Sequence, residues 1–283
     1  MAQTKIAYPF FIKVIRFLFP ILESIAPSVA VKWAVKLFLT PFQFGFTLTE
    51  KQHLDKFKMH DVIISRFKIR TYEIGEGPLI ICVHGWAGRG MQFYKMAIDL
   101  ADAGYKLLLI DAPAHGMSEG KMSNLFEFIE VFNGLKEKQD NLVAVIGHSL
   151  GAVSISLAIS EGSKVPAFIS LGAPVVAQDI LDEFANKLNL NKTTIHGMRE
   201  KAVTTFSRTF DSVAMETTFK EVDCPVLAFH GSNDFDVPVY HLDVLKKIKP
   251  KTEIRRIEGI GHRRILKDER VIKEIKNWLL TLK

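Results

Sequence analysis

The stretch VAVIGHSLG, residues 143–151, decides the fold of this chain. It indicates a buried apolar strand that ends in Gly-x-Ser-x-Gly and passes directly into a helix-like segment from Ala152 to Ser160. Glycines two residues either side of Ser149 permit a sharp strand-to-helix turn that a Cβ would block. This turn, the nucleophile elbow, raises the serine Oγ above the sheet edge. We predict Ser149 as a nucleophile; the alternative is a helix-capping serine in a tight turn.

A second apolar strand, residues 79–83, leads into the His-Gly-rich loop at 84–88. Acyl transfer needs two N–H donors aimed at the developing oxyanion. One donor comes from the residue after the nucleophile and the other from a loop of this kind after an earlier strand. The sequence therefore predicts an oxyanion hole formed by the N–H groups of Leu150 and Trp86. His84 is interpreted as a residue that shapes the loop.

A third strand, residues 225–230, ends in GSNDFDVP at 231–238. An acid that orients a catalytic histidine should lie just past a strand end, and Asp234 does. Asp236, two residues further on, is the rival. The pattern Gly-x-x-Asp-x-x-Val-Pro favours Asp234 as the acid, with Asp236 capping a helix that begins near Val239.

A short strand at 254–257 is followed by a glycine-rich loop that ends in His262. The glycines give this histidine freedom to approach the serine. The chain order Ser149, Asp234, His262 is that of the elbow-type enzymes, and it differs from the orders of trypsin-like and subtilisin-like enzymes. The sequence thus predicts a catalytic triad of these three residues.

A fourth motif, DAPAHGMS at 111–118, follows the strand at 106–110. With these four motifs, the chain resembles the α/β-hydrolase superfamily over residues 62–283. Ala114 stands where the family usually has glycine, in a loop beside the site. The resemblance implies an α/β fold with a mostly parallel sheet of about eight strands, crossover helices and a helical lid insertion.

The resemblance also implies a serine hydrolase that cleaves a carboxylic ester or thioester through an acyl-enzyme on Ser149. A peptidase, amidase or acyltransferase would use the same triad, and a cofactor-free haloperoxidase-like or lyase activity is a further alternative. A non-catalytic binding protein on this scaffold is disfavoured because the triad and the elbow glycines are intact. The sequence contains no metal-ligand spacing, phosphate-binding loop or dinucleotide fingerprint, so we expect no cofactor and no metal.

The remaining elements alternate as in a parallel sheet with crossover helices. An antiparallel hairpin is expected at 61–74. The expected strands lie near 79–83, 106–110, 142–146, 166–171, 225–230 and 253–257, and the expected helices near 90–102, 124–138, 150–161, 239–248 and 267–281.

The interval from Pro174 to Glu221 is too long for one crossover helix. We therefore predict three domains: a helical arm at 1–60, a hydrolase core at 61–174 and 222–283, and a helical lid at 175–221. Several lid side chains are candidates to line an apolar acyl pocket, although each could instead pack the lid together: Phe184, Met198, Phe206 and Phe210, with Met215 and Phe219 as further candidates.

Composition excludes several classes of partner. The net charge is a mild +6, and no basic stripe interleaved with aromatics indicates nucleic acid. A small-molecule acyl substrate, apolar in character, is expected instead. Cys82 and Cys224 fall in or beside different apolar strands, which favours buried thiols over a disulfide and fits a cytoplasmic protein.

The aromatic-rich N-terminal segment is interrupted by basic residues and lacks an apolar span of about 18 residues, so no transmembrane helix is expected. It also lacks the form of a signal peptide. One interpretation is a helical arm that packs Trp33, Leu37 and Phe38 on the hydrolase body. The alternative is peripheral membrane contact through residues 1–40.

Overall fold

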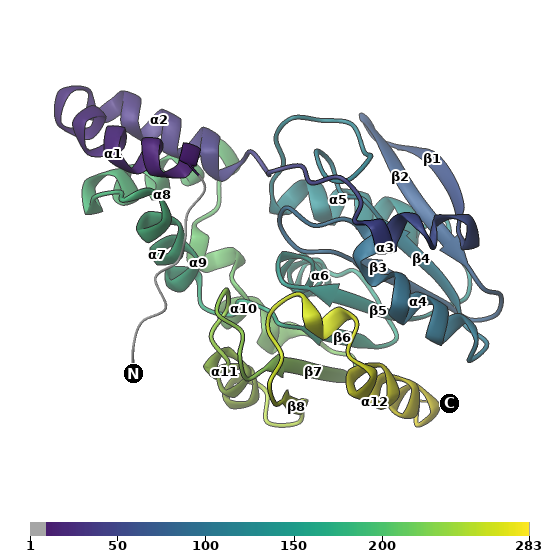
Figure 1. Ribbon diagram of the computed structural model, residues 1–283. Helices are drawn as coiled ribbons and strands as arrows, with labels where there is room; N and C mark the ends of the chain where they lie inside the picture. Colours follow the sequence, from purple (N-terminus) through teal and green to yellow (C-terminus); the bar gives the residue numbers. More distant parts are fainter. Residues whose placement is uncertain (1–9, 283) are drawn as a thin grey trace. The chain divides into compact units, whose positions relative to one another are not determined.

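The computed structural model describes residues 10–282, which divide into two compact units (Figure 1). The helical unit comprises residues 10–39 together with Ala177–Val213. The sheet unit comprises residues 40–176 and 214–282. Each unit is described by itself below.

The sheet unit contains one eight-stranded sheet in the order β1-β2-β4-β3-β5-β6-β7-β8 (Figure 1). The hairpin β1–β2 is antiparallel, β2 pairs antiparallel with β4, and every pairing from β4 to β8 is parallel. The mostly parallel α/β sheet expected from the sequence is therefore confirmed. The strands are β1 (Lys58–Ile64), β2 (Phe67–Ile74), β3 (Leu79–Val83), β4 (Lys106–Ile110), β5 (Leu142–His148), β6 (Phe168–Leu171), β7 (Val226–Gly231) and β8 (Glu253–Ile257).

The central strands are continuous apolar runs because a parallel sheet is covered by helices on both faces. All residues of β3, β6 and β7 are buried. Helix α6 is apolar all round for the same reason, with every residue from Gly151 to Ile159 buried. The helices of this unit are α3 (Leu48–Lys51), α4 (Tyr94–Ala101), α5 (Leu125–Lys136), α6 (Leu150–Ser160), α10 (Met215–Thr218), α11 (Tyr240–Ile248) and α12 (Glu269–Leu280), with short 3-10 turns η1 (Leu54–Lys56), η2 (Gly90–Phe93), η3 (Phe219–Glu221) and η4 (Arg264–Leu266).

The helical unit joins the N-terminal arm to the inserted segment. Its helices are α1 (Phe10–Ile25), α2 (Pro27–Phe38), α7 (Ala177–Leu188), α8 (Lys192–Phe206) and α9 (Phe210–Val213). A small core forms where Phe19 of α1 and Ala30 and Ala34 of α2 meet Met198 of α8. Small residues allow this close approach, since a Cβ on Gly197 would lie 2.5 Å from the Val31 side chain. The arm thus packs on the inserted segment, with the partly buried Leu37 and Phe38 of α2 against this core.

The boundaries of the units differ from the expected 1–60 arm and 175–221 insertion. Residues 40–60 belong to the sheet unit, where the buried carboxylate of Glu50 is paired with the Arg89 guanidinium. Residues 214–221 also belong to it, because the Thr218 hydroxyl lies 3.0 Å from the Ser156 hydroxyl of α6. The buried contacts of these two segments therefore place the end of the arm at residue 39 and the end of the inserted segment at residue 213. Within residues 10–282, no helix is long and apolar enough to cross a membrane.

Candidate active site

Ser149 lies at a sharp turn between β5 and α6 with φ of +52° and ψ of −122°. This is a strained backbone conformation for a residue with a side chain, and it is typical of a nucleophile elbow. The flanking glycines are required by close approach. A Cβ on Gly147 would lie 2.6 Å from the Ala152 Cα, and one on Gly151 would lie 2.2 Å from the Val83 carbonyl oxygen.

The loop at residues 84–88 passes directly beside this turn. A Cβ on Gly85 would lie only 2.7 Å from the Ser149 Cβ, so the loop backbone contacts the serine. Trp86 follows Gly85 and is half-buried, with its ring 5.1 Å from that of His115. Leu150 is the first residue of α6, so its N–H has no acceptor within the helix. The two N–H groups expected to form the oxyanion hole thus belong to residues on either side of Ser149.

His84 holds the shape of this loop, in agreement with its expected role. Its Nδ1 lies 2.7 Å from the Gly85 carbonyl oxygen, and its Nε2 accepts a hydrogen bond of 3.0 Å from the backbone N–H of Ala112. Complete burial lowers the pKa of His84 well below its ordinary value, which keeps the imidazole neutral. His84 therefore ties the end of β3 to the end of β4.

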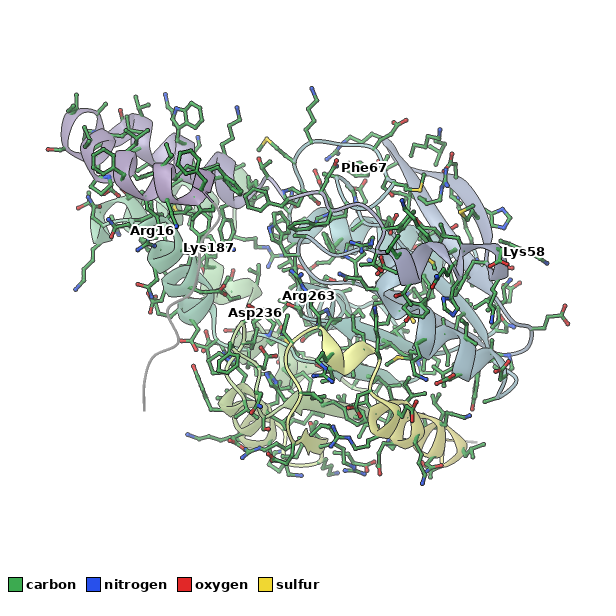
Figure 2. The ribbon with its side chains drawn as sticks, in the orientation of Figure 1. Arg16, Lys58, Phe67, Lys187, Asp236 and Arg263 are labelled. Carbon is green, nitrogen blue, oxygen red and sulfur yellow. The ribbon has the colours of Figure 1, made fainter. Side chains whose placement is uncertain are left out.

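His262 and Asp234 form a hydrogen bond of 2.7 Å between Nδ1 and Oδ2. Burial alone would raise the pKa of Asp234, but hydrogen bonds from His230 and His262 lower it below its usual range. The side chain of Asp236 is exposed, and its backbone N–H donates to Asp234 Oδ1 at 3.0 Å (Figure 2). The structure therefore brings Asp234, and not its rival, to the imidazole.

The end of β6 links Ser149 to this pair. The backbone N–H of Ser149 donates to the Leu171 carbonyl oxygen at 2.9 Å. The next residue, Gly172, adjoins the pair, because a Cβ placed there would lie 3.4 Å from His262 Nδ1 and 3.5 Å from Asp234 Oδ2. The three residues expected to form the triad thus follow β5, β7 and β8, and they gather beside the carboxyl end of β6.

Two further histidines, His148 and His230, contact the candidate site. His148 Nε2 lies 2.9 Å from the backbone carbonyl oxygen of His262, with the two rings 4.6 Å apart. Burial, followed by the neighbouring His262, lowers the pKa of His148 to about 3, so the neutral ring donates this hydrogen bond. His230 lies 3.4 Å from Asp234 Oδ2 and 2.8 Å from the Val237 carbonyl oxygen. Both side chains fix the positions of His262 and Asp234.

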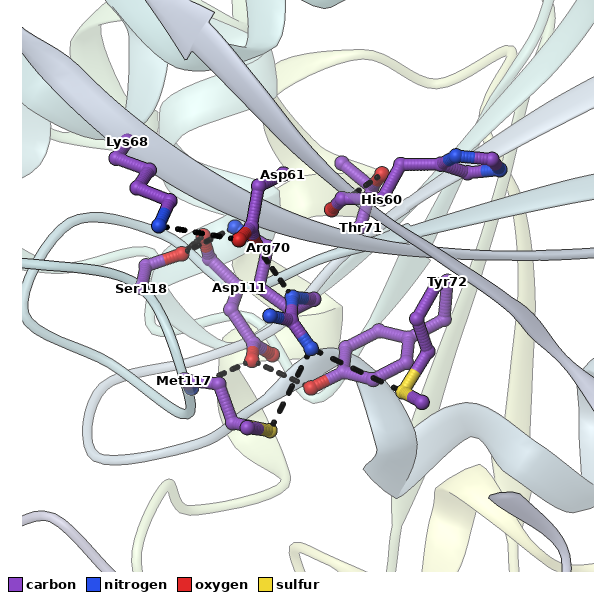
Figure 3. A network of polar contacts seen from close by, with 10 residues as sticks. His60, Asp61, Lys68, Arg70, Thr71, Tyr72, Asp111, Met117 and Ser118 are labelled. Carbon is purple, nitrogen blue, oxygen red and sulfur yellow. Dashed lines mark hydrogen bonds and ion pairs between the residues drawn. The ribbon is translucent and has the colours of Figure 1, made fainter. Parts of the chain in front are cut away.

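Asp111 anchors the 111–118 loop through its carboxylate (Figure 3). Its carboxylate accepts hydrogen bonds from the Tyr72 hydroxyl at 2.8 Å and from the backbone N–H groups of Met117 at 2.8 Å and Gly90 at 2.6 Å. Burial nevertheless raises the pKa of Asp111 to about 6. Ala114, in the position usually held by glycine, adopts φ of +62°. Asp111 therefore joins this loop to the segment that follows the oxyanion loop.

Four of the six side chains that the sequence offers as candidates to line an acyl pocket are packed against other parts of the protein. Met198 is 1% exposed inside the core of the helical unit, so it is not available to line a pocket. Phe184 packs edge-on against Phe38 with ring centroids 5.0 Å apart. Met215 and Phe219 are fully buried in the sheet unit. These four side chains serve packing, because amphipathic spacing does not reveal which neighbour a helix face meets.

Phe206 and Phe210 are half-buried in the helical unit. The Phe210 ring lies 5.7 Å from that of Phe38 and beneath the guanidinium of Arg199. These two residues stay candidates for substrate contact.

A pocket of about 830 Å³ lies beside the loop that follows His262. Its lining includes Arg263, Arg264 and Lys267 from this loop and Arg89 and Gln92 from the segment after the oxyanion loop (Figure 2). None of Ser149, Asp234 and His262 lines this pocket. It is therefore a neighbour of the candidate site and does not define where an acyl group would bind.

Comparison with known proteins agrees with this geometry. A family model described as alpha/beta hydrolase fold matches residues 78–194, which contain the oxyanion loop and the elbow. An esterase of Pyrococcus furiosus has a similar structure, with a TM-score of 0.64 and 19% identity over 85% of this chain and 98% of that chain. The chain therefore has the α/β-hydrolase fold.

Curated relatives match only part of their own length. The magnesium-chelatase 30 kDa subunit of Rhodobacter capsulatus is 31% identical over 102 residues, covering 35% of each chain. The 2-hydroxy-6-oxo-6-phenylhexa-2,4-dienoate hydrolase of Comamonas testosteroni is 27% identical over 133 residues, covering 44% of this chain and 46% of its own. The chain thus spans less than half the length of these relatives.

Proposed function

We propose that this protein is a serine hydrolase that cleaves a carboxylic ester or thioester through an acyl-enzyme on Ser149. The observation that carries the proposal is the 2.7 Å hydrogen bond between His262 Nδ1 and Asp234 Oδ2 at the sheet edge that also carries the strained Ser149 turn. A buried acid–imidazole pair beside a serine elbow is the arrangement that nucleophilic acyl transfer requires.

The proposed chemistry follows from the hydrogen bonding of the imidazole. Because Nδ1 donates to Asp234, the lone pair of His262 resides on Nε2 and can accept the Ser149 hydroxyl proton. Ser149 Oγ then forms a bond to the acyl carbon while the bond to the leaving group breaks, and His262 returns the proton to the leaving group. Water attacks the acyl-enzyme with His262 again as base, which releases the acid and restores Ser149.

The oxyanion of each tetrahedral intermediate would be stabilised by the backbone N–H groups of Trp86 and Leu150. Donors of this kind contribute about 3 kcal/mol each to the transition state. The loop carrying Trp86 is held rigidly by the His84 hydrogen bonds, which favours preorganised donors.

An apolar acyl substrate is the class we propose. Support comes from the names of proteins similar in structure, which include the Pyrococcus esterase and a putative lipase of Acinetobacter baumannii. As part of this proposal, the inserted helices act as a lid. Phe206 and Phe210 are the side chains that would contact the acyl chain.

Two alternatives use the same scaffold. A peptidase, amidase or acyltransferase would need no change in Ser149, Asp234 or His262, and differs only in leaving group and water access. A non-catalytic binding role is the other alternative, and the name of one relative, the magnesium-chelatase 30 kDa subunit, describes no hydrolysis.

A hydrolysis profile separates these alternatives. Purified protein is assayed on p-nitrophenyl esters of increasing chain length, on an acyl-CoA and on an aminoacyl anilide. We expect ester or thioester turnover that Ser149→Ala lowers by about 10⁴-fold or more. Ser160→Ala, at the other end of α6, is the matched control and should retain wild-type activity. Turnover of the anilide alone would favour the amidase, and no turnover of any substrate would favour the non-catalytic role.

A further inference from the structure

Helix α1 is apolar on both of its faces, although only one face is packed. Ile12 and Phe19 are buried against the rest of the helical unit. The opposite face carries large apolar side chains at helical spacing, with Phe10 82%, Phe17 73% and Ile25 78% exposed. The full exposed stripe of α1 comprises Phe10, Val14, Phe17, Leu18, Ile21 and Ile25. Exposed apolar surface of this extent is typical of a protein or membrane interaction site.

The spacing of these residues makes the stripe continuous. Positions 10, 14, 17, 18, 21 and 25 recur every three or four residues, so their side chains lie on one side of a helix with 3.6 residues per turn. Helix α2 adds Trp33, which is 52% exposed, with the Lys36 Nζ 5.4 Å from its ring. Tryptophan is enriched at membrane–water interfaces, where its ring meets headgroups.

The charges of α1 and α2 decide between kinds of partner. The two helices carry four basic residues, Lys13, Arg16, Lys32 and Lys36, of which the three lysines are exposed. Their one acidic residue, Glu23, is buried and accepts a hydrogen bond of 2.9 Å from the backbone N–H of Asn191. The exposed surface of the pair is therefore apolar and positive.

We propose that the exposed stripe of α1 docks this protein on an anionic lipid surface. An interfacial helix inserts its apolar face at the headgroup boundary and presents basic residues to anionic lipids, which is the distribution seen on α1. A second copy of the chain fits less well, because pairing two identical positively charged surfaces would bring like charges together. Docking does not depend on the proposed hydrolase activity.

The test is flotation of the full chain with vesicles made of equal parts phosphatidylcholine and phosphatidylglycerol. We expect the wild-type protein to float with these vesicles and to bind pure phosphatidylcholine vesicles more weakly. The double variant Phe17→Gln/Ile21→Gln should bind at least about tenfold more weakly, since it removes two inserting side chains. The matched control Ile63→Gln/Leu280→Gln replaces two similarly exposed apolar residues of the sheet unit and should bind like wild type.

Thermal melting of each variant shows whether the fold is retained, and glutamine is a good helix former at these exposed positions. If Phe17→Gln/Ile21→Gln melts early, Val14→Gln/Ile25→Gln replaces it on the same stripe. Wild-type protein that stays unbound overturns the proposal, as does a stripe variant that binds like wild type. A third outcome would also overturn the proposal: the wild-type protein forms a dimer in solution and does not bind vesicles, and the stripe variant is a monomer. That result would assign the stripe to contact with a second copy of the chain.

Discussion

Asp234 Oδ2 and His262 Nδ1 are 2.7 Å apart although 28 residues separate them in the chain. The acid follows β7 and the histidine follows β8, and these strands pair in parallel, so their carboxyl ends meet at one sheet edge. His148 holds the backbone of the histidine and His230 adjoins the acid, so both partners are fixed. The pair is therefore preorganised by neighbours on β5 and β7.

Replacing the acid should disable the imidazole without unfolding the protein. Asp234→Asn removes the negative charge and the preference for the Nδ1–H tautomer, so we expect kcat for ester hydrolysis to fall by about 10⁴-fold. Asp236→Asn is the matched control and should stay within about a factor of two of wild type. Steady-state kinetics of both variants checks this. Loss of activity in the control but not in Asp234→Asn would transfer the role to Asp236.

The chain should lose stability in mild acid because three histidines are buried in the neutral form. Burial lowers the pKa of His148 to about 3 and that of His115 to about 4, and it lowers the pKa of His84 as well. Their stabilisation is complete above the unfolded pKa of 6.5 and is lost as pH falls toward these folded values.

Asp111 acts in the opposite direction, since burial raises its pKa from 3.8 to about 6 and the folded state takes up its proton first. The histidines outweigh Asp111, so we expect the free energy of unfolding to fall by at least about 2 kcal/mol between about pH 7 and pH 5. Urea denaturation at several pH values measures it. An unchanged midpoint across this range would show that these histidines are not held neutral.

Met198→Ala should separate a packing role from a substrate-binding role. The side chain is buried among α1, α2 and α8, so its truncation should cost about 2–4 kcal/mol of stability and leave KM for esters unchanged. Val203→Ala, at an exposed position of the same helix, should cost less than about 0.5 kcal/mol. A raised KM with unchanged stability in Met198→Ala would return this residue to the substrate site.

The strands, and the positions of the three candidate triad residues after strand ends, could be predicted from the sequence because their signals are local. Residues 79–83 and 106–110 coincide with β3 and β4, since a buried parallel strand is a short continuous apolar run bounded by turn residues. Ser149 and Asp234 each follow such a run and His262 follows the more polar strand β8, which is why residues after strand ends could be chosen in advance.

The packing of the helical unit could not be predicted in this way. Contacts between α2 and α8 join residues far apart in the sequence, such as Val31 and Gly197, and an apolar helix face does not specify its partner. His148 occupies a variable position of the elbow motif, so its hydrogen bond to the His262 carbonyl had no sequence signal. The boundary after residue 39 could not be predicted either. Glu50 is held in the sheet unit by its ion pair with Arg89, and the sequence does not show that these two distant residues are in contact.

Covalent labelling with a fluorophosphonate tests the central claim most directly, because the reagent reacts with a serine only when a base and an oxyanion hole activate it. Intact-mass and peptide mass spectrometry of the wild-type protein should show a single adduct on the peptide that contains Ser149, and Ser149→Ala should remain unlabelled. A folded wild-type protein that gains no adduct, or that carries it on another residue, would contradict the assignment of Ser149 as the nucleophile.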